Sequence, residues 1–441
     1  MDPRRLIAVS AVSLVSACSI FGTTDQVVPG RGYVVADEPQ AAQVGADILA
    51  HGGNAADAIT ATYLALSVTY PVAAGLGGGG VCVVRAGQKS ASFDFQAREA
   101  GGPYAVPGNV SGFSMLQAIY GRLPWQRVVA PAESFAAAGF GISHGLEVRL
   151  ADSSSIVRLD ATLSSEFLNE SGEIRPVGSQ VTAPALAQTL ARIRTQGPEV
   201  FYRGRPANQI VSYSGAQGGG ITAADLESYA ADRSAPLIVR VAGLDVYLPA
   251  ASTGAGRYAS AILSHLVGAQ GRVEVSGSKL APLVFSAAKG GLLANDTASP
   301  PPDLGSTGFA AVDGQGMAVA CGVTMNGPFG SGHTVAPTGV TLANAPNIGR
   351  LGLSNTFLTP LVAMSDGQLL LAGTGTGGPE GSAGILLTML QAAGGENIIE
   401  PGILRGTGHE PLETVNIIGC RSDICVAVAD PRSYGLGAAA N

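Results

Sequence analysis

Residues 306–324 read STGFAAVDGQGMAVACGVT, the pattern of a strand, a tight turn and a second strand. A two-residue turn at Gly314-Gln315 would place Ser306 opposite Val323. Thr324 then lies within one residue of Ser306, at a cross-strand spacing of about 5 Å. A slip of one residue would turn the two side chains to opposite faces of the sheet. The hairpin therefore predicts two neighbouring hydroxyl residues at its open end and leaves their facing undecided.

Two alanine-rich helices are expected upstream of this hairpin. Asp37-Glu38-Pro39-Gln40 supplies a capping residue, a first-turn proline and a glutamine three residues beyond Asp37. We expect a helix to start there and to run to Gly52-Gly53. A second helix should start at Asn54 and end at Tyr70-Pro71, because the residue before a proline disfavours the helical conformation.

A glycine-rich loop, residues 75–80, contains a formal G-x-G-x-x-G pattern. A dinucleotide-binding loop requires a strand before the glycines and a helix after them. Here a helical pattern precedes the loop, and an apolar strand-like run, residues 81–84, follows it. The order predicts a structural turn with close backbone approach and argues against a dinucleotide site.

Composition indicates a folded protein with a small-molecule or peptide partner. The 441 residues are 46% hydrophobic and 13% charged, which suffices for a large core in one domain or in two merged ones. The 62 glycines indicate many tight turns. A net charge of -7, with no Lys/Arg cluster beyond the N-terminus, argues against nucleic-acid binding.

The N-terminus has the pattern of a targeting segment. Arg4 and Arg5 precede an apolar run, residues 6–15, that is too short to span a bilayer. Val15-Ser16-Ala17-Cys18 resembles a bacterial lipobox. We therefore expect a signal peptide over residues 1–17, a lipidated Cys18, a tether over 18–30, and a location on the periplasmic side of a bacterial membrane. The alternative is an ordinary cleaved signal peptide in which Cys18 is incidental.

The remaining cysteines allow one local disulfide prediction. Cys420 and Cys425 flank a short polar turn and could close a hairpin disulfide in an oxidising compartment; the alternative is two unpaired strand cysteines. Cys82 and Cys321 lie in apolar strand-like runs. The five histidines are scattered without zinc-site spacing, so no metal is expected.

Several short segments follow one another in the order typical of the gamma-glutamyltransferase family, which this chain resembles from about Ala36 to its C-terminus. They include residues 52–58, 75–80, 107–112, 120–125, 201–204 and 430–432. The resemblance implies an α+β fold, a four-layer αββα sandwich of the N-terminal-nucleophile hydrolase type. It also implies a precursor that cleaves itself into a large chain, residues 31–305, and a small chain, residues 306–441, which stay associated. No cofactor is implied.

The resemblance also assigns catalytic roles. Its register makes Ser306 the first residue of the small chain and the nucleophile, whose own new amine accepts the proton. Thr307, after a shift of one residue, is the rival nucleophile, and absence of any processing is the other alternative. Thr324 corresponds to the threonine that hydrogen-bonds the nucleophile, and Gly377 and Gly378 correspond to the glycines whose N–H groups stabilise the oxyanion.

The resemblance further implies a substrate site with a departure from the family pattern. Arg98 and Thr356 correspond to residues that bind the substrate carboxylate, and Asn326 corresponds to one that contacts the glutamyl group. The alternative for Arg98 is a surface ion pair, because the family commonly has its arginine directly after the Phe that is Phe95 here. Residues 343–348 lack the acid that binds the substrate α-amine in the family, and the segment between Leu266 and Asp303 is shortened. A buried ammonium without its carboxylate would bind poorly, so the missing acid argues against free gamma-glutamyl substrates such as glutathione. The resemblance as a whole implies transfer or hydrolysis of gamma-glutamyl or related amide groups. The alternative hypothesis is an inactive relative that serves as a binding or structural lipoprotein of the envelope.

Overall fold

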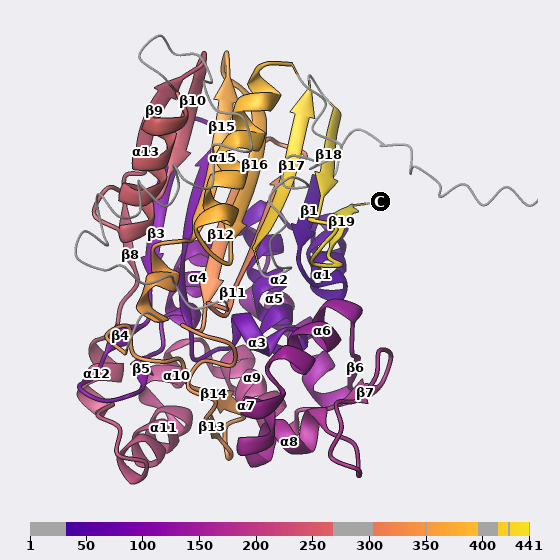
Figure 1. The fold of residues 1–441 in the computed structure, drawn as a ribbon, viewed down its shortest axis with the longest axis vertical. Coiled ribbons are helices and arrows are strands. Elements are labelled where there is room, and N and C mark those ends of the chain that lie inside the picture. The colour runs from indigo at the N-terminus through magenta and orange to yellow at the C-terminus, as the bar shows by residue number, and fades with distance from the viewer. Residues whose placement is uncertain (1–31, 268–302, 349–350, 396–412, 422–423, 441) are drawn as a thin grey trace, which may run out of the picture.

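The computed structural model describes residues 32–267, 303–348, 351–395, 413–421 and 424–440. The predicted signal peptide, Cys18 and the tether lie outside these residues, as does the proline-rich segment before residue 303. In the described part, two antiparallel sheets stack face to face, and helices cover the outer face of each sheet (Figure 1). This architecture is the predicted α+β, four-layer αββα sandwich.

The first sheet carries the hairpin that begins at Ser306. Its strand order is β19 (Leu436–Ala439), β1 (Gly32–Ala36), β11 (Ser306–Asp313), β12 (Ala318–Thr324), β2 (Gly79–Ala86), β3 (Lys89–Phe95) and β8 (Asp232–Ser234). The second sheet has the order β18 (Ile424–Val428), β17 (Thr414–Arg421), β16 (Gln368–Thr376), β15 (Thr359–Ser365), β10 (Leu244–Leu248) and β9 (Leu237–Val241). Strands β11 and β12 therefore lie at the centre of one sheet and pack on β15 and β16 of the other.

The helices divide between the two outer faces and one end of the sandwich. Helices α1 (Pro39–Ala50), α2 (Ala55–Thr69) and α4 (Asn109–Tyr120) lie on the first sheet or on one another, and α13 (Gly254–Leu266) and α15 (Pro379–Ala393) cover the second. The other helices among the described residues are α3 (Pro71–Ala74), α5 (Trp125–Ala138), α6 (His144–Asp152), α7 (Ser154–Leu159), α8 (Ala161–Phe167), α9 (Pro184–Gln196), α10 (Glu199–Arg203), α11 (Arg205–Ala216) and α12 (Ala223–Ser228).

Side-chain alternation along β11 separates two apolar layers. Phe309 packs with the helix-facing core, whereas Ala310 packs with Ala372 and Ile418 in the core between the sheets. Successive strand residues point to opposite faces, so even-numbered residues of β11 face the second sheet. Ser306 belongs to that even-numbered set.

The predicted helix starts are confirmed with one correction. Helix α2 begins after Asn54, which forms a capping box with Asp57, and ends before Tyr70-Pro71. Helix α1 is capped by Glu38, whose carboxylate accepts hydrogen bonds from the N–H groups of Gln40 and Ala41. Asp37, the expected cap, instead turns its carboxylate into the protein interior, where side chains of the second sheet bind it.

The glycine-rich loop makes the predicted close backbone approach and leads from α3 into β2. A Cβ atom on Gly77 would lie 2.1 Å from the Thr341 carbonyl oxygen, and one on Gly79 would lie 2.1 Å from the backbone nitrogen of Ala97. Real Cβ atoms do not approach other atoms so closely, so the loop needs glycine for packing.

The hairpin forms as predicted, but its predicted register was wrong by one residue. Ser306 pairs directly with Thr324, and Val312 pairs with Ala318. The turn is longer than two residues because the Asp313 N–H bonds to the Met317 carbonyl oxygen at 3.0 Å and the Asp313 carboxylate accepts the N–H groups of Gln315 and Met317. The consequence is that Ser306 and Thr324 lie on the same face of the sheet.

Two disulfides join neighbouring strands. Cys420 and Cys425 are bonded across the β17–β18 hairpin, and Cys82 of β2 is bonded to Cys321 of β12. The second pair could not be foreseen because its members are separated by 239 residues.

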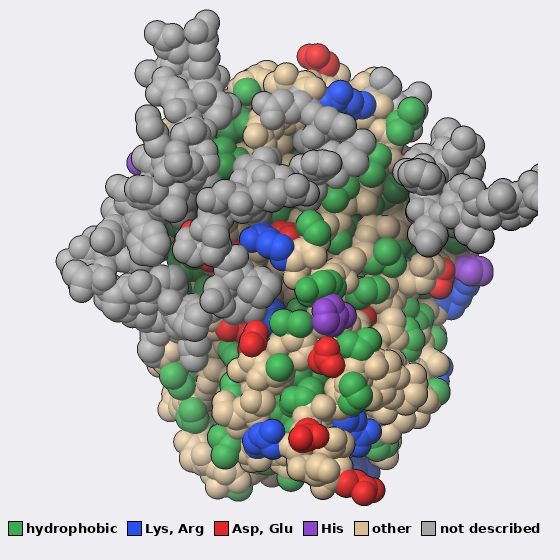
Figure 2. Space-filling model, turned by 45° about the vertical axis from the view of Figure 1, so that its right-hand side comes forward, with side chains coloured by type: hydrophobic (Ala, Val, Ile, Leu, Met, Phe, Trp, Pro, Cys, Tyr) green, Lys and Arg blue, Asp and Glu red, His purple; other side chains and the backbone are tan. Residues whose placement is uncertain are grey.

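The visible surface of the described part carries no concentrated positive charge (Figure 2). On the face shown in Figure 2, the Lys and Arg side chains of the described residues stand singly and form no patch. Among the helices that the structure describes, none combines the length and the apolar character that a membrane span requires.

Candidate active site

The predicted catalytic residues lie at the same end of the sandwich. Ser306 begins β11 and faces Thr324, the last residue of β12. Two residues along the same face, a Cβ atom on Gly308 would lie 3.2 Å from Thr376 Cγ2 of β16. Gly377 and Gly378 follow Thr376 directly and lead into α15. The hydroxyl pair and the glycine pair therefore belong to the same end of the fold.

The peptide bond before Ser306 is held in a conformation that requires glycine. Gly305 has a φ of 58°, and a Cβ atom there would lie 1.9 Å from the Gly327 carbonyl oxygen. The bond lies in buried surroundings, because Leu304 is 1% exposed, Ser306 4% and Thr324 1%. Any charge that develops on this peptide bond is therefore governed by nearby protein dipoles.

Two donors contact the carbonyl oxygen of Gly305. The Met325 N–H donates to it at 2.9 Å, and the Thr324 hydroxyl lies 3.1 Å from it. The same hydroxyl lies 3.0 Å from the Leu304 carbonyl oxygen, so its single hydrogen is shared between two acceptors. The Asn326 N–H donates to Thr324 Oγ1 at 2.9 Å and thereby directs the hydroxyl hydrogen toward the carbonyls. This arrangement polarises the carbonyl that Ser306 would attack.

The rival nucleophile, Thr307, has a different environment. It is fully buried, and its hydroxyl donates to Asp37 Oδ2 at 2.7 Å. Asp37 also accepts from Asn416 Nδ2 at 2.8 Å and from the Thr414 hydroxyl at 3.1 Å. Burial raises the pKa of Asp37, although the hydrogen bonds from Thr307 and Asn416 act to lower it. Thr307 thus links the first sheet to the second through a buried carboxylate.

Three buried side-chain oxygens in the segments that follow β12 and lead into β15 have no hydrogen-bond partner. Asn326 is fully buried with a φ of 55°; its Nδ2 donates to the Asn344 carbonyl oxygen at 2.9 Å, whereas its Oδ1 has no partner. Asn355 Oδ1 and Thr359 Oγ1 also lack partners, and Thr359 begins β15 beside Gly375. Thr356, predicted to bind substrate, is 8% exposed in the same segment. Buried polar atoms without partners are rare and can bind a polar ligand.

Arg98 is held at the surface by other residues. Its Nη2 donates to the Ala230 carbonyl oxygen at 2.8 Å, and its guanidinium lies 4.5 Å from the centre of the Tyr229 ring. The preceding residue, Ala97, packs against Gly79, which pairs with Thr324. Arg98 therefore lies near the same end of the first sheet as Thr324, but its guanidinium binds the Ala230 carbonyl oxygen and packs on the Tyr229 ring.

A titratable carboxyl group lies against the predicted oxyanion glycines. Glu413 Oε2 accepts the Gly381 N–H at 2.9 Å, and a Cβ atom on Gly378 would lie 2.2 Å from Glu413 Oε1. Burial, reinforced by the charge of Glu380, raises the pKa of Glu413 to about 7. Sequence reasoning missed this residue because no local pattern connects it to the glycine pair.

A buried ion pair lies directly before the Gly305–Ser306 bond. Arg149 Nη2 lies 2.8 and 2.9 Å from the two carboxylate oxygens of Asp303, and the side chains are 6% and 15% exposed. Asp303 Oδ1 also accepts the Gly305 N–H at 2.7 Å. Burial opposes the charge of Arg149, but the nearby Asp303, Tyr70 and Asp37 together outweigh it and raise the pKa of Arg149. Sequence reasoning missed this pair as well.

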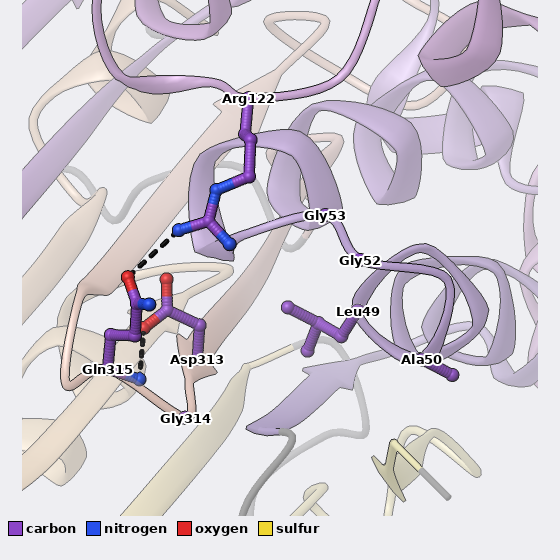
Figure 3. Close-up of a pocket in the computed structure, with 8 residues that line it drawn as sticks. All are labelled: Leu49, Ala50, Gly52, Gly53, Arg122, Asp313, Gly314 and Gln315. Atoms are coloured by element: carbon purple, nitrogen blue, oxygen red, sulfur yellow. Dashed lines mark hydrogen bonds between the residues drawn. The ribbon is translucent and has the colours of Figure 1, made fainter.

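A separate hollow of about 440 Å³ lies beside the turn at the opposite end of the hairpin (Figure 3). Arg122 Nη2 donates to Gln315 Oε1 at 2.8 Å across it, and Leu49, Gly52 and Asp313 contribute to its walls. Strand β11 separates it from Ser306 by roughly 20 Å, at about 3.3 Å per residue. It is therefore distinct from the candidate active site. Among the described residues, no group of three His, Cys, Asp or Glu side chains is placed to hold a metal ion.

Sequence comparison identifies the family. The profile of the Gamma-glutamyltranspeptidase family matches residues 41–102 and 99–289, more than half of the chain. The chain belongs to the gamma-glutamyltranspeptidase family. A relative in Escherichia coli (strain K12), "Glutathione hydrolase proenzyme", is 28% identical over an alignment 450 residues long. The alignment covers 82% of this chain and 77% of the relative.

Solved structures show the same fold. The cephalosporin acylase from Bacillus halodurans superposes with a TM-score of 0.73 and 20% sequence identity, covering 97% of this chain and 99% of the acylase. The Helicobacter pylori gamma-glutamyltranspeptidase gives a TM-score of 0.53 and 23% identity, covering 62% of this chain and 85% of that one. The fold is that of the N-terminal-nucleophile hydrolases, and the relatives of this chain are enzymes of the amidohydrolase type.

Proposed function

We propose that this chain cleaves its own Gly305–Ser306 bond and then hydrolyses or transfers gamma-glutamyl or related amide groups. One observation carries the proposal: Ser306 and Thr324 share a face, and the Gly305 carbonyl oxygen accepts hydrogen bonds from Met325 and Thr324. A carbonyl held by two donors is prepared for the negative charge of a tetrahedral intermediate.

In the proposed self-cleavage, Ser306 Oγ attacks the Gly305 carbonyl carbon and loses its proton. The C–N bond then breaks, the Ser306 nitrogen takes up a proton, and the acyl group moves to the serine oxygen as an ester. Water hydrolyses the ester and leaves a carboxylate at Gly305 and a free amine at Ser306. Each oxyanion donor contributes roughly 3 kcal/mol to such a step.

The mature site would use the liberated amine as its base. An α-amine with a pKa near 8 can accept the proton of the Ser306 hydroxyl when that hydroxyl attacks a substrate amide. Thr324 then orients the nucleophile, and the N–H groups of Gly377 and Gly378 hold the substrate oxyanion. The glutathione hydrolase relatives support a gamma-glutamyl donor, and the unpaired Asn326 Oδ1 is available to bind its polar end.

Reducing gel electrophoresis of the purified mature protein tests this proposal. We expect two fragments, and N-terminal sequencing of the smaller one should begin at Ser306. Ser306→Ala should stay uncut. Thr307→Ala should still be cut, because the Thr307 hydroxyl donates a hydrogen bond to Asp37 and is not the nucleophile in this proposal. A single uncut wild-type band would support the alternative of an inactive relative. A new end at Thr307 would transfer the nucleophile role to that residue.

We also propose that the chain is exported, lipidated at Cys18 and held on the periplasmic side of a bacterial membrane. The support is the lipobox-like sequence, together with two disulfides, which form and persist in oxidising compartments. Cell fractionation tests this: the wild-type protein should sediment with membranes and Cys18→Ser should not. Equal distribution of the two would contradict lipid attachment.

A further inference from the structure

The residues just before the proposed cleavage site form a turn that is held from outside the hairpin. The carboxylate of Asp303 accepts the N–H of Gly305 at 2.7 Å, which closes the turn two residues along the chain. The Arg149 guanidinium, from helix α6, holds both oxygens of that carboxylate. The guanidinium also lies 5.8 Å from the centre of the buried Tyr70 ring. The turn is therefore fixed to the helical part of the protein.

This turn determines where the Gly305 carbonyl points. Gly305 adopts a left-handed conformation, and its carbonyl oxygen must meet the Met325 N–H and the Thr324 hydroxyl. The Leu304 carbonyl oxygen is fixed in the same way by the Gly327 N–H at 2.9 Å. Asp303 is the residue directly before Leu304. If the Asp303 side chain rotated freely, the Gly305–Ser306 bond would be anchored only on its downstream side.

We propose that Arg149 is a positioning residue for the self-cleavage. It acts through Asp303, which sets the turn that presents the Gly305 carbonyl to the Ser306 hydroxyl. The proposal rests on the proposed function, because it concerns the same cleavage. Arg149 touches neither the scissile bond nor Ser306 in this role.

The test measures the first-order rate of precursor cleavage in the full chain. Arg149→Met keeps the length of the side chain and removes the charge, and should slow cleavage about 100-fold, the effect of a misplacement near 1 Å. Arg149→Lys restores a charge without the planar guanidinium and should recover part of the rate. Recovery by lysine would not follow from a purely packing role. Arg194→Met removes a different partly buried ion pair, with Glu133, and should cleave normally.

A second variant keeps the proposal testable if Arg149→Met does not fold. Asp303→Asn retains an oxygen acceptor for the Gly305 N–H and loses only the charge that holds Arg149, so it should cleave at least 10-fold more slowly than wild type. Cleavage of folded Arg149→Met or of Asp303→Asn within twofold of wild type would overturn the proposal. A wild-type precursor that never cleaves would instead refute the proposed function itself, and the positioning role with it.

A second inference comes from the disulfide between Cys82 and Cys321. Cys82 lies upstream of the proposed cleavage site and Cys321 downstream, on the directly paired strands β2 and β12. Both residues are fully buried. We infer that this disulfide joins the large and small chains covalently after self-cleavage. Cys420–Cys425 lies entirely downstream of the site and cannot do so.

The chemistry of the two bonds is independent. Cleavage consumes water and breaks only the C–N bond between Gly305 and Ser306, so the S–S bond survives it. Formation of the disulfide releases two protons and passes two electrons to a disulfide oxidant, such as oxidised glutathione or a thiol oxidoreductase. The nucleophile hairpin would then stay attached to β2 after the chain is cut.

Paired gels test the covalent link. The exported protein, treated with N-ethylmaleimide before denaturation, should run as one band without reductant and as two bands with it. Cys321→Ser should give two bands under both conditions, and Cys425→Ser should behave like wild type. Two wild-type bands without reductant would overturn the link alone. One wild-type band with reductant would refute self-cleavage, and the interchain link would fall with it.

Discussion

Replacement of Gly305 by alanine should slow self-cleavage strongly while the protein still folds. Gly305 has a φ of 58°, which costs an alanine about 1–2 kcal/mol. Its new Cβ atom would also lie 1.9 Å from the Gly327 carbonyl oxygen. Atoms of this kind do not approach within 3.0 Å, so one of the two backbones must move by about 1 Å.

That movement falls on the carbonyl that Ser306 attacks. The Met325 N–H and Thr324 hydroxyl contacts to the Gly305 oxygen are 2.9 and 3.1 Å, and a shift of 1 Å breaks at least one of them. Loss of one oxyanion donor, or a 1 Å misplacement, slows a reaction by about 100-fold. We therefore expect Gly305→Ala to cleave at least about 100-fold more slowly than wild type.

The assay is a time course of purified precursor on reducing gels, with thermal unfolding measured in parallel. Gly87→Ala is the matched control, because Gly87 has a φ of 57° in open space and carries the backbone cost without the clash. Gly87→Ala should lose a similar amount of backbone stability and cleave normally. If folded Gly305→Ala cleaved as fast as Gly87→Ala, the reasoning about the held carbonyl would be wrong.

Three further predictions test the surroundings of the site. Folding raises the pKa of Glu413 from 4.5 to about 7, so ionisation of this carboxyl group opposes folding. The free energy of unfolding of the wild type, relative to that of Glu413→Gln, should therefore fall by up to roughly 3 kcal/mol as the pH rises from 4.5 to above 7. Melting temperatures of the wild type and of Glu413→Gln that are equal to each other at pH 5 and also at pH 8 would contradict this. Asp37→Ala leaves the donors of Thr307, Thr414 and Asn416 without their acceptor and should cost at least about 3 kcal/mol in denaturant unfolding; a loss below 1 kcal/mol would argue against the buried network. Thr324→Val keeps the shape and removes the hydroxyl, so precursor cleavage should slow about 100-fold on a gel time course, and an unchanged rate would exclude a role for that hydroxyl.

Local chemistry made the helices and the hairpin predictable. The Asn54 cap and Tyr70-Pro71 mark the two ends of α2 within a few residues of sequence. The apolar runs on either side of Asp313–Gly316 were sufficient for the strands. They were not sufficient for the register, because the side-chain and backbone hydrogen bonds of Asp313 lengthen the turn by one residue. Likewise, Glu38 caps α1 because Asp37 is drawn into a network with the second sheet.

The sequence by itself determined the strand, turn and strand pattern, both ends of α2 and the family, since each depends on neighbouring residues or on their order along the chain. Only the tertiary structure decided which side chains meet. Arg149 and Asp303 are 154 residues apart, and Cys82 and Cys321 are 239 apart. Such pairs depend on how the sheets and helices stack, and a pattern of adjacent residues carries no information about that stacking.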